Sequence, residues 1–399
     1  MQTITEKLSR FFSGCPVEHA RPKYLPPPGP PPKKLVHIPP LPSGSPKPVN
    51  FPFLTEQQCI TLYSQGFAQV YLPPNHPLLD AATALFSTSH AFFDKPLDEK
   101  QKFHRSQLIS DPSVSGPRNT EQGWSRVEGE KEMLTIRRTS KLCPPEVAHN
   151  ARVLWRECGS FMQSIMRAIE SSLELESGAF DNVVTQECEL PVGDMYETLL
   201  RMFRYERTSE PRIVSEKHRD IGLLSLVIGS SPGLEVWDDR IAREDPITGV
   251  VSNGDWVAIE ENSSQVKPIG GLTFTLLVGE TLTALTNQLY KPGAHRVLVP
   301  PAESSASDAM YRYSLVFALR PHKQGIIHTP SLQTAITGQF NWPPEDEKGV
   351  IPTIKAVDLF TTIANRHWSV NDQVKDREAK KARLEKEREA AAQRVLMKS

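Results

Sequence analysis

The pattern of hydrophobic and polar positions changes once along the chain, from helical spacing to short β-rich runs. Before about Leu175, apolar residues recur every three or four positions, as they do on one face of a helix. From about Leu199, short apolar runs are separated by clusters of Gly, Pro, Asn and Asp. This order predicts an α+β protein in which helices precede an antiparallel sandwich or barrel of jelly-roll type.

The first half predicts three helices and one strand. Thr55 is a suitable N-cap for the first helix and Gly66 a suitable stop, and the short strand Phe67–Leu72 follows. A second helix runs through "PLLDAATALFSTSHAFF" until Pro96, where a charged helix or turn begins. The third helix spans Glu146–Leu175, and the stretch before it is polar and predicts a loop.

The second half predicts the β core. Its apolar runs are "LLRMFRY", "LLSLVIG", "LEVWD", "WVAIE", "LTFTLLVG", "HRVLVP" and "RYSLVFALR". Their number and their turn-rich spacing indicate one principal β domain.

Changes in composition divide the chain into five regions. Residues 1–53 form a proline-rich arm, and residues 54–195 form a region of helices with one strand. The jelly-roll core occupies 196–323, a helical extension 324–373, and a charged helical tail 374–399. The arm is either a stiff cover over the fold or a docking ligand for a proline-recognising domain. The tail is either solvated and frayed or the partner of another helix, although it has no sustained apolar seam.

Charge and cysteine usage narrow the class of protein. Lys and Arg total 46 against 47 Asp and Glu, so no global field favours nucleic acid or an anionic membrane. Five scattered cysteines without a C-x-x-C pair suit reduced thiols. The chain shows no apolar signal region and no apolar stretch long enough to span a bilayer, so we expect a cytoplasmic protein without nucleic-acid or membrane partners.

A charged pair stands at the head of a buried run in "SEKHRDIGLLSLVIG". Burying such charges costs roughly several kcal/mol unless a partner charge or a metal offsets it. If the run is a strand, His218 and Asp220 share one face and Arg219 points to the other. By itself the pattern is weak, because a salt-bridged pair at the mouth of a strand explains it equally well.

Later residues strengthen the case for a metal. His295 follows a Gly turn at the start of another apolar strand, so it can reach the same barrel mouth. Two imidazoles and one carboxylate form the facial triad of non-haem iron(II). Arg312 and Ser314 lie at i and i+2 of a third strand, and a guanidinium beside a hydroxyl is a receptor for a carboxylate.

With these motifs the chain resembles the isopenicillin N synthase-like branch of the iron(II) and 2-oxoglutarate-dependent dioxygenases. "HRD", "AHRV" and "RYS" match the H-x-D, distal His and R-x-S motifs of that family in order. "PGLEVWDD", "WVAIE" and "LLVGETLTALTN" match its intervening strands, and "GFAQVYLPP" and "AFFDKPLDEKQKF" match its N-terminal half. The resemblance runs from roughly Leu54 to Pro321.

The resemblance implies a double-stranded β-helix that binds Fe(II) through His218, Asp220 and His295. It implies that 2-oxoglutarate is bound at its far carboxylate by Arg312 and Ser314. O2 would be the second cosubstrate, and a small organic molecule would be hydroxylated or desaturated. Tyr205 lies where the family often has a tyrosine that touches the same carboxylate, although "FRYE" replaces the N-Y-Y-P motif of the family.

Residues that set the choice of substrate are harder to predict. Trp237 and Phe317 are candidate pocket residues by strand parity, although the sequence favours an ordinary core role for each. Arg137 and Arg138 either meet an acidic substrate or are surface charges. The segments 240–255 and 300–310 lengthen two connections and are expected to rim the pocket.

The same motifs are compatible with two rival functions. One is a 2-oxoglutarate-independent oxidase or cyclase of isopenicillin N synthase type, in which Arg312 and Ser314 hold the carboxylate of the substrate itself. The other is a non-catalytic interaction protein that retains the fold and binds a protein partner through its proline-rich arm or charged tail.

Overall fold

The structure is a computed structural model. The residues that it describes are 45–47, 49–108, 121–184, 189–191, 197–244, 251–260, 271–302, 310–322, 324–344, 351 and 353–396. The proline-rich arm lies outside the described residues except for 45–47 and 49–53, and much of the two lengthened connections lies outside them as well.

The larger of two facing sheets has seven antiparallel strands in the order β1-β9-β6-β11-β4-β3-β2. These strands are β1 (Phe67–Leu72), β2 (Gly123–Val127), β3 (Lys131–Ile136), β4 (Leu199–Glu206), β6 (Leu224–Gly229), β9 (Leu272–Val278) and β11 (Tyr311–Leu319). Because successive side chains alternate between faces, one face of this sheet packs on helices and the other faces the smaller sheet.

The smaller sheet has four strands in the order β5-β10-β7-β8. They are β5 (Arg212–His218), β7 (Leu234–Glu244), β8 (Val251–Ala258) and β10 (His295–Val299). From β4 to β11 the chain passes repeatedly between the two sheets. A cluster of buried side chains that includes Phe203, Val236 and Val297 fills the space between them. A short pair, β12 (Ile326–Ile327) with β13 (Ile354–Lys355), lies apart from both sheets.

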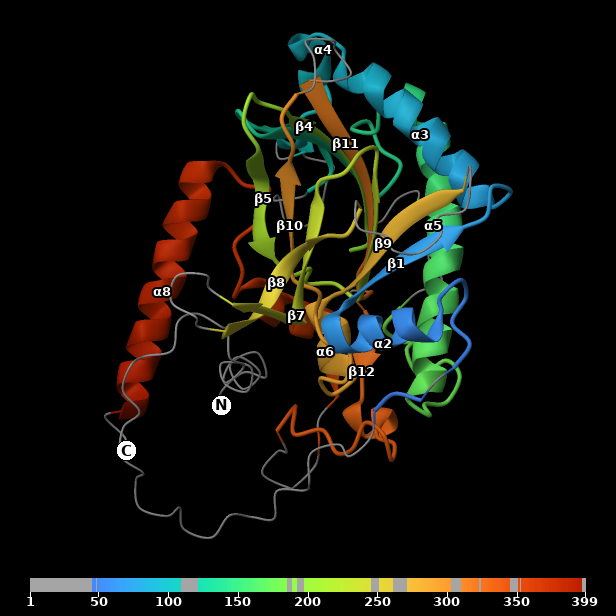
Figure 1. Cartoon of the computed structure of the whole chain (residues 1–399), viewed down its shortest axis with the longest axis vertical. Coiled ribbons are helices and arrows are strands. Elements are labelled where there is room, and N and C mark those ends of the chain that lie inside the picture. Colours follow the sequence, from blue (N-terminus) through green and yellow to red (C-terminus); the bar gives the residue numbers. More distant parts are fainter. Residues whose placement is uncertain are drawn as a thin grey trace.

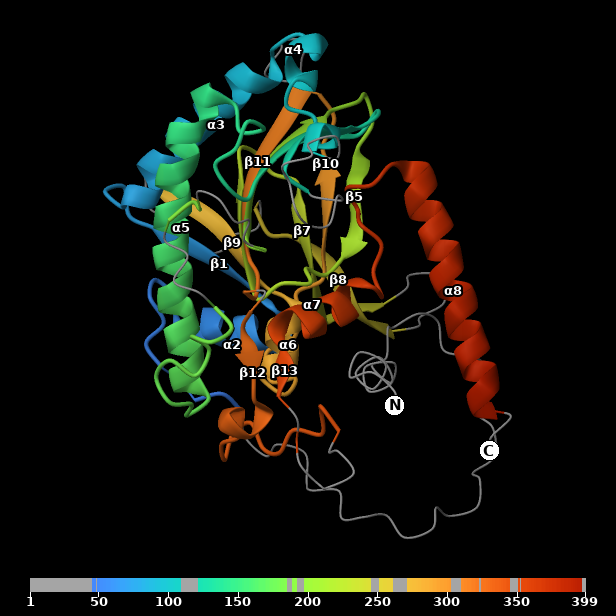
Figure 2. The same ribbon diagram turned by 180° about the vertical axis from the view of Figure 1, so that it is seen from behind.

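The longer helices of the described N-terminal half are α2 (Glu56–Gln65), α3 (Pro77–Phe93) and α5 (Pro145–Ser172). Figures 1 and 2 show α3 and α5 along one side of the molecule, next to the larger sheet. The predicted caps are confirmed, because Thr55 forms a capping box with Gln58 and Gly66 ends α2 in the left-handed conformation at φ 79°. The remaining helices are α4 (Leu97–Gln101), α6 (Glu280–Leu285), α7 (Ala356–Ala364), α8 (Val374–Leu396), and the 3₁₀ turns η1 (Arg105–Leu108) and η3 (Thr329–Leu332).

The predicted loop before α5 was wrong, because β2 and β3 lie there and extend the larger sheet. Their charged residues hide the strand pattern. Lys131 is fully buried and Glu132 nearly so. Glu132 pairs with Lys100 at 2.8 Å and with Arg204 at 2.9 Å, so its charge is balanced inside the fold.

The region 54–195 is also structurally continuous with the β core. It supplies β1, β2 and β3 to the same sheet as the core strands. The predicted helical extension, 324–373, contains α7 but also η3 and the β12–β13 pair, so it is only partly helical.

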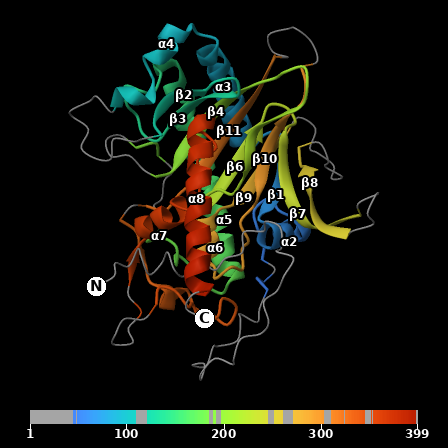
Figure 3. The same ribbon diagram turned by 90° about the vertical axis from the view of Figure 1, so that its left-hand side faces the viewer.

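The charged tail forms α8, which lies on the opposite side of the molecule from α5 (Figures 1 and 3) and beside β5 (Figures 1 and 2). The expected solvated or frayed tail is wrong for the first turns of this helix. Arg377 is 2% exposed and pairs with Glu130 at 2.6 Å, and Lys381 pairs with Glu216 of β5. These ion pairs and the buried side chain of Leu384 hold the helix in place, although it has no sustained apolar seam.

The described cysteines are reduced and buried. Cys59, Cys143 and Cys158 are buried free thiols, whereas Cys15 and Cys188 lie outside the described part. None of the described helices combines the length and the apolar character that crossing a bilayer requires.

Candidate functional site

Three predicted ligands meet at one end of the space between the two sheets. His218 is the last residue of β5, His295 is the first residue of β10, and the two are paired across these antiparallel strands. Asp220 follows β5 by two residues. One ligand atom from each of the three side chains lies within 4.8 Å of the others. In the described part of the chain, this group is the one whose geometry suits a metal ion.

The predicted route by which these residues meet was partly wrong. The sequence expectation placed His218 and Asp220 on one face of a strand that continues to Gly229. Instead, β5 ends at His218, Asp220 lies in the connection, and the next strand begins at Leu224. The chain crosses from the smaller to the larger sheet there, and this turn directs the carboxylate towards the two imidazoles.

Hydrogen bonds fix the tautomer and the orientation of both imidazole rings. Nδ1 of His218 lies 2.7 Å from the carbonyl oxygen of Glu216, and Nδ1 of His295 lies 3.1 Å from that of Gly293. A carbonyl can only accept, so each Nδ1 carries the proton and donates it. Each Nε2 therefore keeps a free lone pair, as a metal ligand must.

The electrostatics also suit metal ligation. Burial, together with the neighbouring His295, lowers the pKa of His218 to about 3. Burial opposes ionisation of Asp220, but His295, His218 and a hydrogen bond from Ser225 outweigh it and hold the pKa of Asp220 below its ordinary value. At neutral pH the site thus offers a neutral imidazole at His218 and a carboxylate at Asp220, the protonation states that bind divalent metals.

A second polar group lies in the same interior space. Arg312 of β11 is paired with Tyr205 of β4, and Ser314 follows two residues later on the same face. All three are buried. The hydroxyl of Ser314 lies 3.5 Å from that of Tyr205, and the Arg312 guanidinium lies 5.5 Å from the centre of the Tyr205 ring. The structure therefore brings together the three residues that were predicted to bind a carboxylate.

Only two of the three guanidinium nitrogens of Arg312 have hydrogen-bond partners among the described residues. Its Nε donates to the carbonyl oxygen of Ser231 at 3.0 Å, and its Nη2 donates to Glu260 at 3.0 and 3.1 Å. Its Nη1 is buried and has no hydrogen-bond partner among the described residues. A buried donor without a partner is costly, so Nη1 is a natural point of attachment for a bound acceptor.

Sequence reasoning missed Glu260. Oε2 of this carboxylate also accepts the backbone N–H of Leu234 at 2.8 Å, so Glu260 ties β11 to the start of β7. Glu260 ends the run "WVAIE", whose pattern in the sequence indicates a strand and nothing more. No spacing rule relates it to Arg312, which is 52 positions away in the chain.

The two candidate pocket residues, Trp237 and Phe317, both point away from the interior space. Phe317 comes three residues after Ser314, so the pleat of β11 points it to the other face, where it packs on Trp155 of α5 with ring centres 5.2 Å apart. Trp237 neighbours Val236, which faces the interior, and its ring instead meets Trp256 at 5.4 Å and Lys217 at 4.8 Å. Phe317 is therefore a core residue, and Trp237 belongs to the opposite face of its sheet.

Arg137, considered above as either a substrate contact or a surface charge, is buried in an ion pair. Arg137 is 6% exposed and pairs with Glu197 at 2.9 Å, so it is not a surface charge. A related ion-pair group lies nearby, in which Glu121 contacts both Arg201 at 2.7 Å and Arg320 at 2.6 Å. A Cβ atom on Gly222, two residues after Asp220, would lie 3.1 Å from Cγ of Arg320, so this charged group adjoins the triad.

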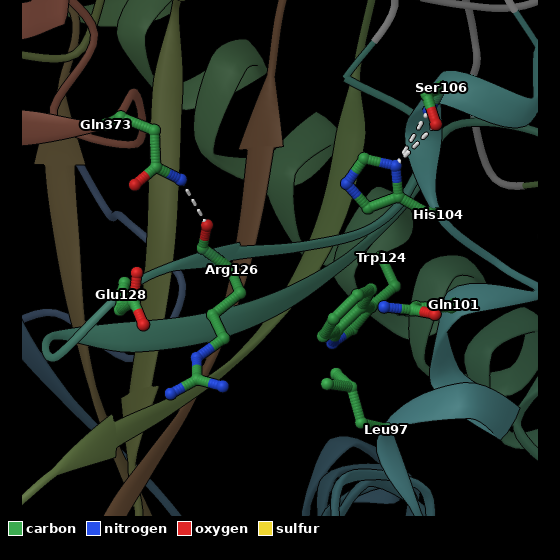
Figure 4. Close-up of a pocket in the computed structure, with 8 residues that line it drawn as sticks. All are labelled: Leu97, Gln101, His104, Ser106, Trp124, Arg126, Glu128 and Gln373. Carbon is green, nitrogen blue, oxygen red and sulfur yellow. Dashed lines mark hydrogen bonds between the residues drawn. The ribbon is translucent and has the colours of Figure 1, made fainter.

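Two hollows in the described part of the chain lie outside the triad. The larger, of about 570 Å³, is next to β2 (Figure 4). Its lining residues are Leu97, Gln101, His104, Ser106, Trp124, Arg126, Glu128 and Gln373. The smaller, of about 130 Å³, borders Glu260 and includes Gln69, Ser231 and Thr275.

Comparison with known proteins gives the fold. No protein-family model matches the chain, and no curated protein matches its sequence. A protein assigned to the 2OG-Fe(II) oxygenase family from Caulobacter crescentus has a TM-score of 0.52 and 20% identity, covering 78% of this chain and 92% of that chain. A full-length Neurospora crassa protein in complex with alpha-KG and 5-formyluracil has a TM-score of 0.50 and 18% identity, covering 76% of this chain and 86% of that chain. The chain therefore has the fold of the 2OG-Fe(II) oxygenases.

Proposed function

We propose that this protein is a non-haem iron(II) and 2-oxoglutarate-dependent oxygenase that hydroxylates or desaturates a small organic molecule. The observation that carries this proposal is the cluster of His218, Asp220 and His295, whose ligand atoms lie within 4.8 Å of one another. In this interpretation the two facing sheets are a double-stranded β-helix, the jelly-roll form of this fold.

The three side chains fit iron(II) in both number and type. Two imidazoles and one carboxylate leave other coordination positions open, which suits a metal that must also bind small ligands. The carbonyl oxygens of Glu216 and Gly293 hold the two rings in the orientation that ligation needs. A purely structural zinc site would instead close all four positions with protein ligands.

The second polar group fits the far carboxylate of 2-oxoglutarate. The unpartnered Nη1 of Arg312 and the hydroxyls of Ser314 and Tyr205 are three buried donors that face the same interior space. The alpha-KG present in the Neurospora crassa complex is 2-oxoglutarate, and that structure shares the fold of this chain. This similarity supports the same cosubstrate here.

The bound metal and 2-oxoglutarate would supply the oxidising chemistry, for which protein side chains have no equivalent. The chain itself would hold and orient them. His218, Asp220 and His295 would bind the metal, and Arg312 with Ser314 would fix the far end of the cosubstrate. Apolar side chains of the interior cluster, including Val236 and Val297, would exclude water from the same space.

We place the substrate beside the ion pairs that adjoin Asp220. Arg201 lies on the same face of β4 as the buried residues Phe203 and Tyr205, and it donates to Thr135 at 2.7 Å. Arginine and glutamate side chains in this position offer both donors and acceptors. They favour a small polar substrate over a hydrocarbon.

The deciding experiment is an anaerobic titration with iron(II) and 2-oxoglutarate, followed by an assay for oxygen-dependent release of succinate. We expect a weak metal-to-ligand charge-transfer band in the wild-type protein and its loss in Asp220→Ala. Arg219→Ala is the matched control, since Arg219 lies between two ligands without being one. Iron binding and substrate turnover without succinate would instead indicate the 2-oxoglutarate-independent oxidase. Failure to bind iron would favour the interaction protein.

A further inference from the structure

The carboxylate site at Arg312 already contains a carboxylate of the protein. Both oxygens of Glu260 accept from Nη2 of Arg312, at 3.0 and 3.1 Å. Arg312 is 1% exposed at its side chain and Glu260 is 15% exposed, so the ion pair is largely shielded from water. The positive charge expected to attract a cosubstrate is therefore balanced inside the fold.

Two glycines leave the space that the Glu260–Arg312 pair occupies. A Cβ atom on Gly229 would lie 2.2 Å from Oε1 of Glu260 and 2.7 Å from Nη2 of Arg312. A Cβ on Gly233 would lie 2.6 Å from Nε of Arg312. Because no larger residue fits at either position without displacing the pair, the contact between Glu260 and Arg312 is built into the site.

A second carboxylate can still reach the same guanidinium. Nη1 has no partner among the described residues, and Ser314 and Tyr205 lie on the same side of the strands as Arg312. Two carboxylates bound to different nitrogens of one guanidinium lie roughly 5 to 6 Å apart. At an effective dielectric constant near 20 their repulsion corresponds to about a hundredfold in affinity.

We propose that Glu260 is an internal competitor that weakens the binding of 2-oxoglutarate at Arg312 and so sets the cosubstrate concentration at which the enzyme works. This inference rests on the proposed function. Glu260 acts on the far carboxylate of the cosubstrate through the shared guanidinium, and it takes no part in the oxidation itself. Its removal therefore changes affinity for the cosubstrate and leaves the metal site unchanged.

The small hollow beside Glu260 gives its side chain room to move away from Arg312 when a second carboxylate binds. That hollow has a volume of about 130 Å³ and is lined in part by Gln69, Ser231, Thr273 and Thr275. Polar groups there can solvate a carboxylate that has moved away from Arg312. The repulsion is relieved in part by such a movement, so we expect an effect of about tenfold or more, below the full Coulomb value.

The test compares two ligands on two variants. Glu260→Gln removes the charge and keeps the size and the acceptor oxygen. The matched control is Glu235→Gln, which neutralises a glutamate that pairs with Arg296 in the smaller sheet. Dissociation constants are measured anaerobically on the iron(II)-loaded proteins for 2-oxoglutarate and for 2-oxopentanoate, which has a methyl group in place of the far carboxylate. Thermal melts verify that each variant is folded.

We expect Glu260→Gln to bind 2-oxoglutarate at least about tenfold more tightly than the wild type, with 2-oxopentanoate unchanged within about twofold and Glu235→Gln unchanged for both. Unchanged or weaker binding of 2-oxoglutarate by Glu260→Gln would overturn the inference while leaving the proposed function intact. An equal change for both ligands would also overturn it, because it would indicate a general structural effect. Absence of 2-oxoglutarate binding in every protein, with iron bound, would instead remove the proposed function and the inference with it.

Discussion

His295 and His218 face each other across the antiparallel strands β10 and β5, with ring centres 4.1 Å apart. Each ring is held by a carbonyl oxygen two residues before it in the chain. The strand pairing sets the distance between the two rings, and the local backbone sets the direction of each lone pair. Asp220 completes the group from the connection that follows β5.

Loss of the carboxylate is expected to abolish tight metal binding. Asp220→Ala leaves two neutral imidazoles and removes the negative charge, so we expect iron(II) affinity to fall by at least about a hundredfold. Isothermal titration with Co(II) as a stable substitute measures the change. Arg219→Ala should bind Co(II) like the wild type, and equal losses in both variants would contradict the assignment of the ligand.

Removal of one hydroxyl from the carboxylate site is expected to act on the cosubstrate alone. Tyr205→Phe keeps the buried ring beside Arg312 and removes one donor to a charged ligand, which is worth about tenfold in affinity. We expect the KM for 2-oxoglutarate to rise by about that factor while kcat changes little. A fall in kcat at saturating cosubstrate, with KM constant, would place Tyr205 elsewhere in the reaction.

Truncation of Phe317 is expected to affect stability and leave specificity unchanged. This ring is 1% exposed and packs on Trp155, so Phe317→Ala should lower the free energy of unfolding by about 3 to 5 kcal/mol. Urea unfolding measures that loss, and relative kcat/KM values for a panel of substrates should stay constant. Altered substrate selectivity with an unchanged free energy of unfolding would instead indicate that Phe317 contacts the substrate.

The buried Lys131 predicts a pH dependence of stability. Burial lowers its pKa to about 7, opposed by Glu130 and reinforced by Arg377, whereas the unfolded chain keeps the ordinary value near 10.5. Between these values the unfolded state binds the extra proton, so stability rises with pH across that window. Below about pH 7 both states are charged, and the cost of burying the charge is fully present.

Comparison with Lys131→Met isolates this effect. Between pH 7 and pH 10 the free energy of unfolding of the wild type should rise by a few kcal/mol relative to that of the variant. A constant difference between the two proteins is added to this change. That constant difference reflects the lost hydrogen bonds to the carbonyl oxygens of Val214 and Val370. Urea unfolding at pH 6.5, 8 and 9.5 measures the gap, and a gap that does not change with pH would contradict the assignment.

The start of α8 is expected to detach when its buried cation is removed. Arg377→Ala leaves Glu130, 17% exposed, without its partner, and should cost about 2 kcal/mol. Hydrogen exchange of the amides in the first turns of α8 should quicken. Arg383→Ala is the control on the same helix, because Arg383 is 64% exposed and pairs with Glu387 one turn further along α8. Equal protection of α8 in both variants would refute the anchoring role.

Much of the fold was predictable because its signals are local. The capping box at Thr55 and the left-handed stop at Gly66 depend on residues a few positions apart. The apolar runs of the core strands are likewise visible in the sequence. β2 and β3 were missed because Lys131 and Glu132 are buried with partners that lie far away in the chain.

The sequence by itself determined which side chains are candidates for chemistry, since the identity and order of His218, Asp220, His295, Arg312 and Ser314 are enough to indicate a site for a metal and a site for a carboxylate. Only the tertiary structure decided what surrounds them. It placed Asp220 in a connection, turned Phe317 towards α5, docked α8 through Arg377, and set Glu260 on Arg312. The physical reason is that charge pairing and packing depend on distances in space, and sequence spacing fixes such distances only within a single helix, strand or turn.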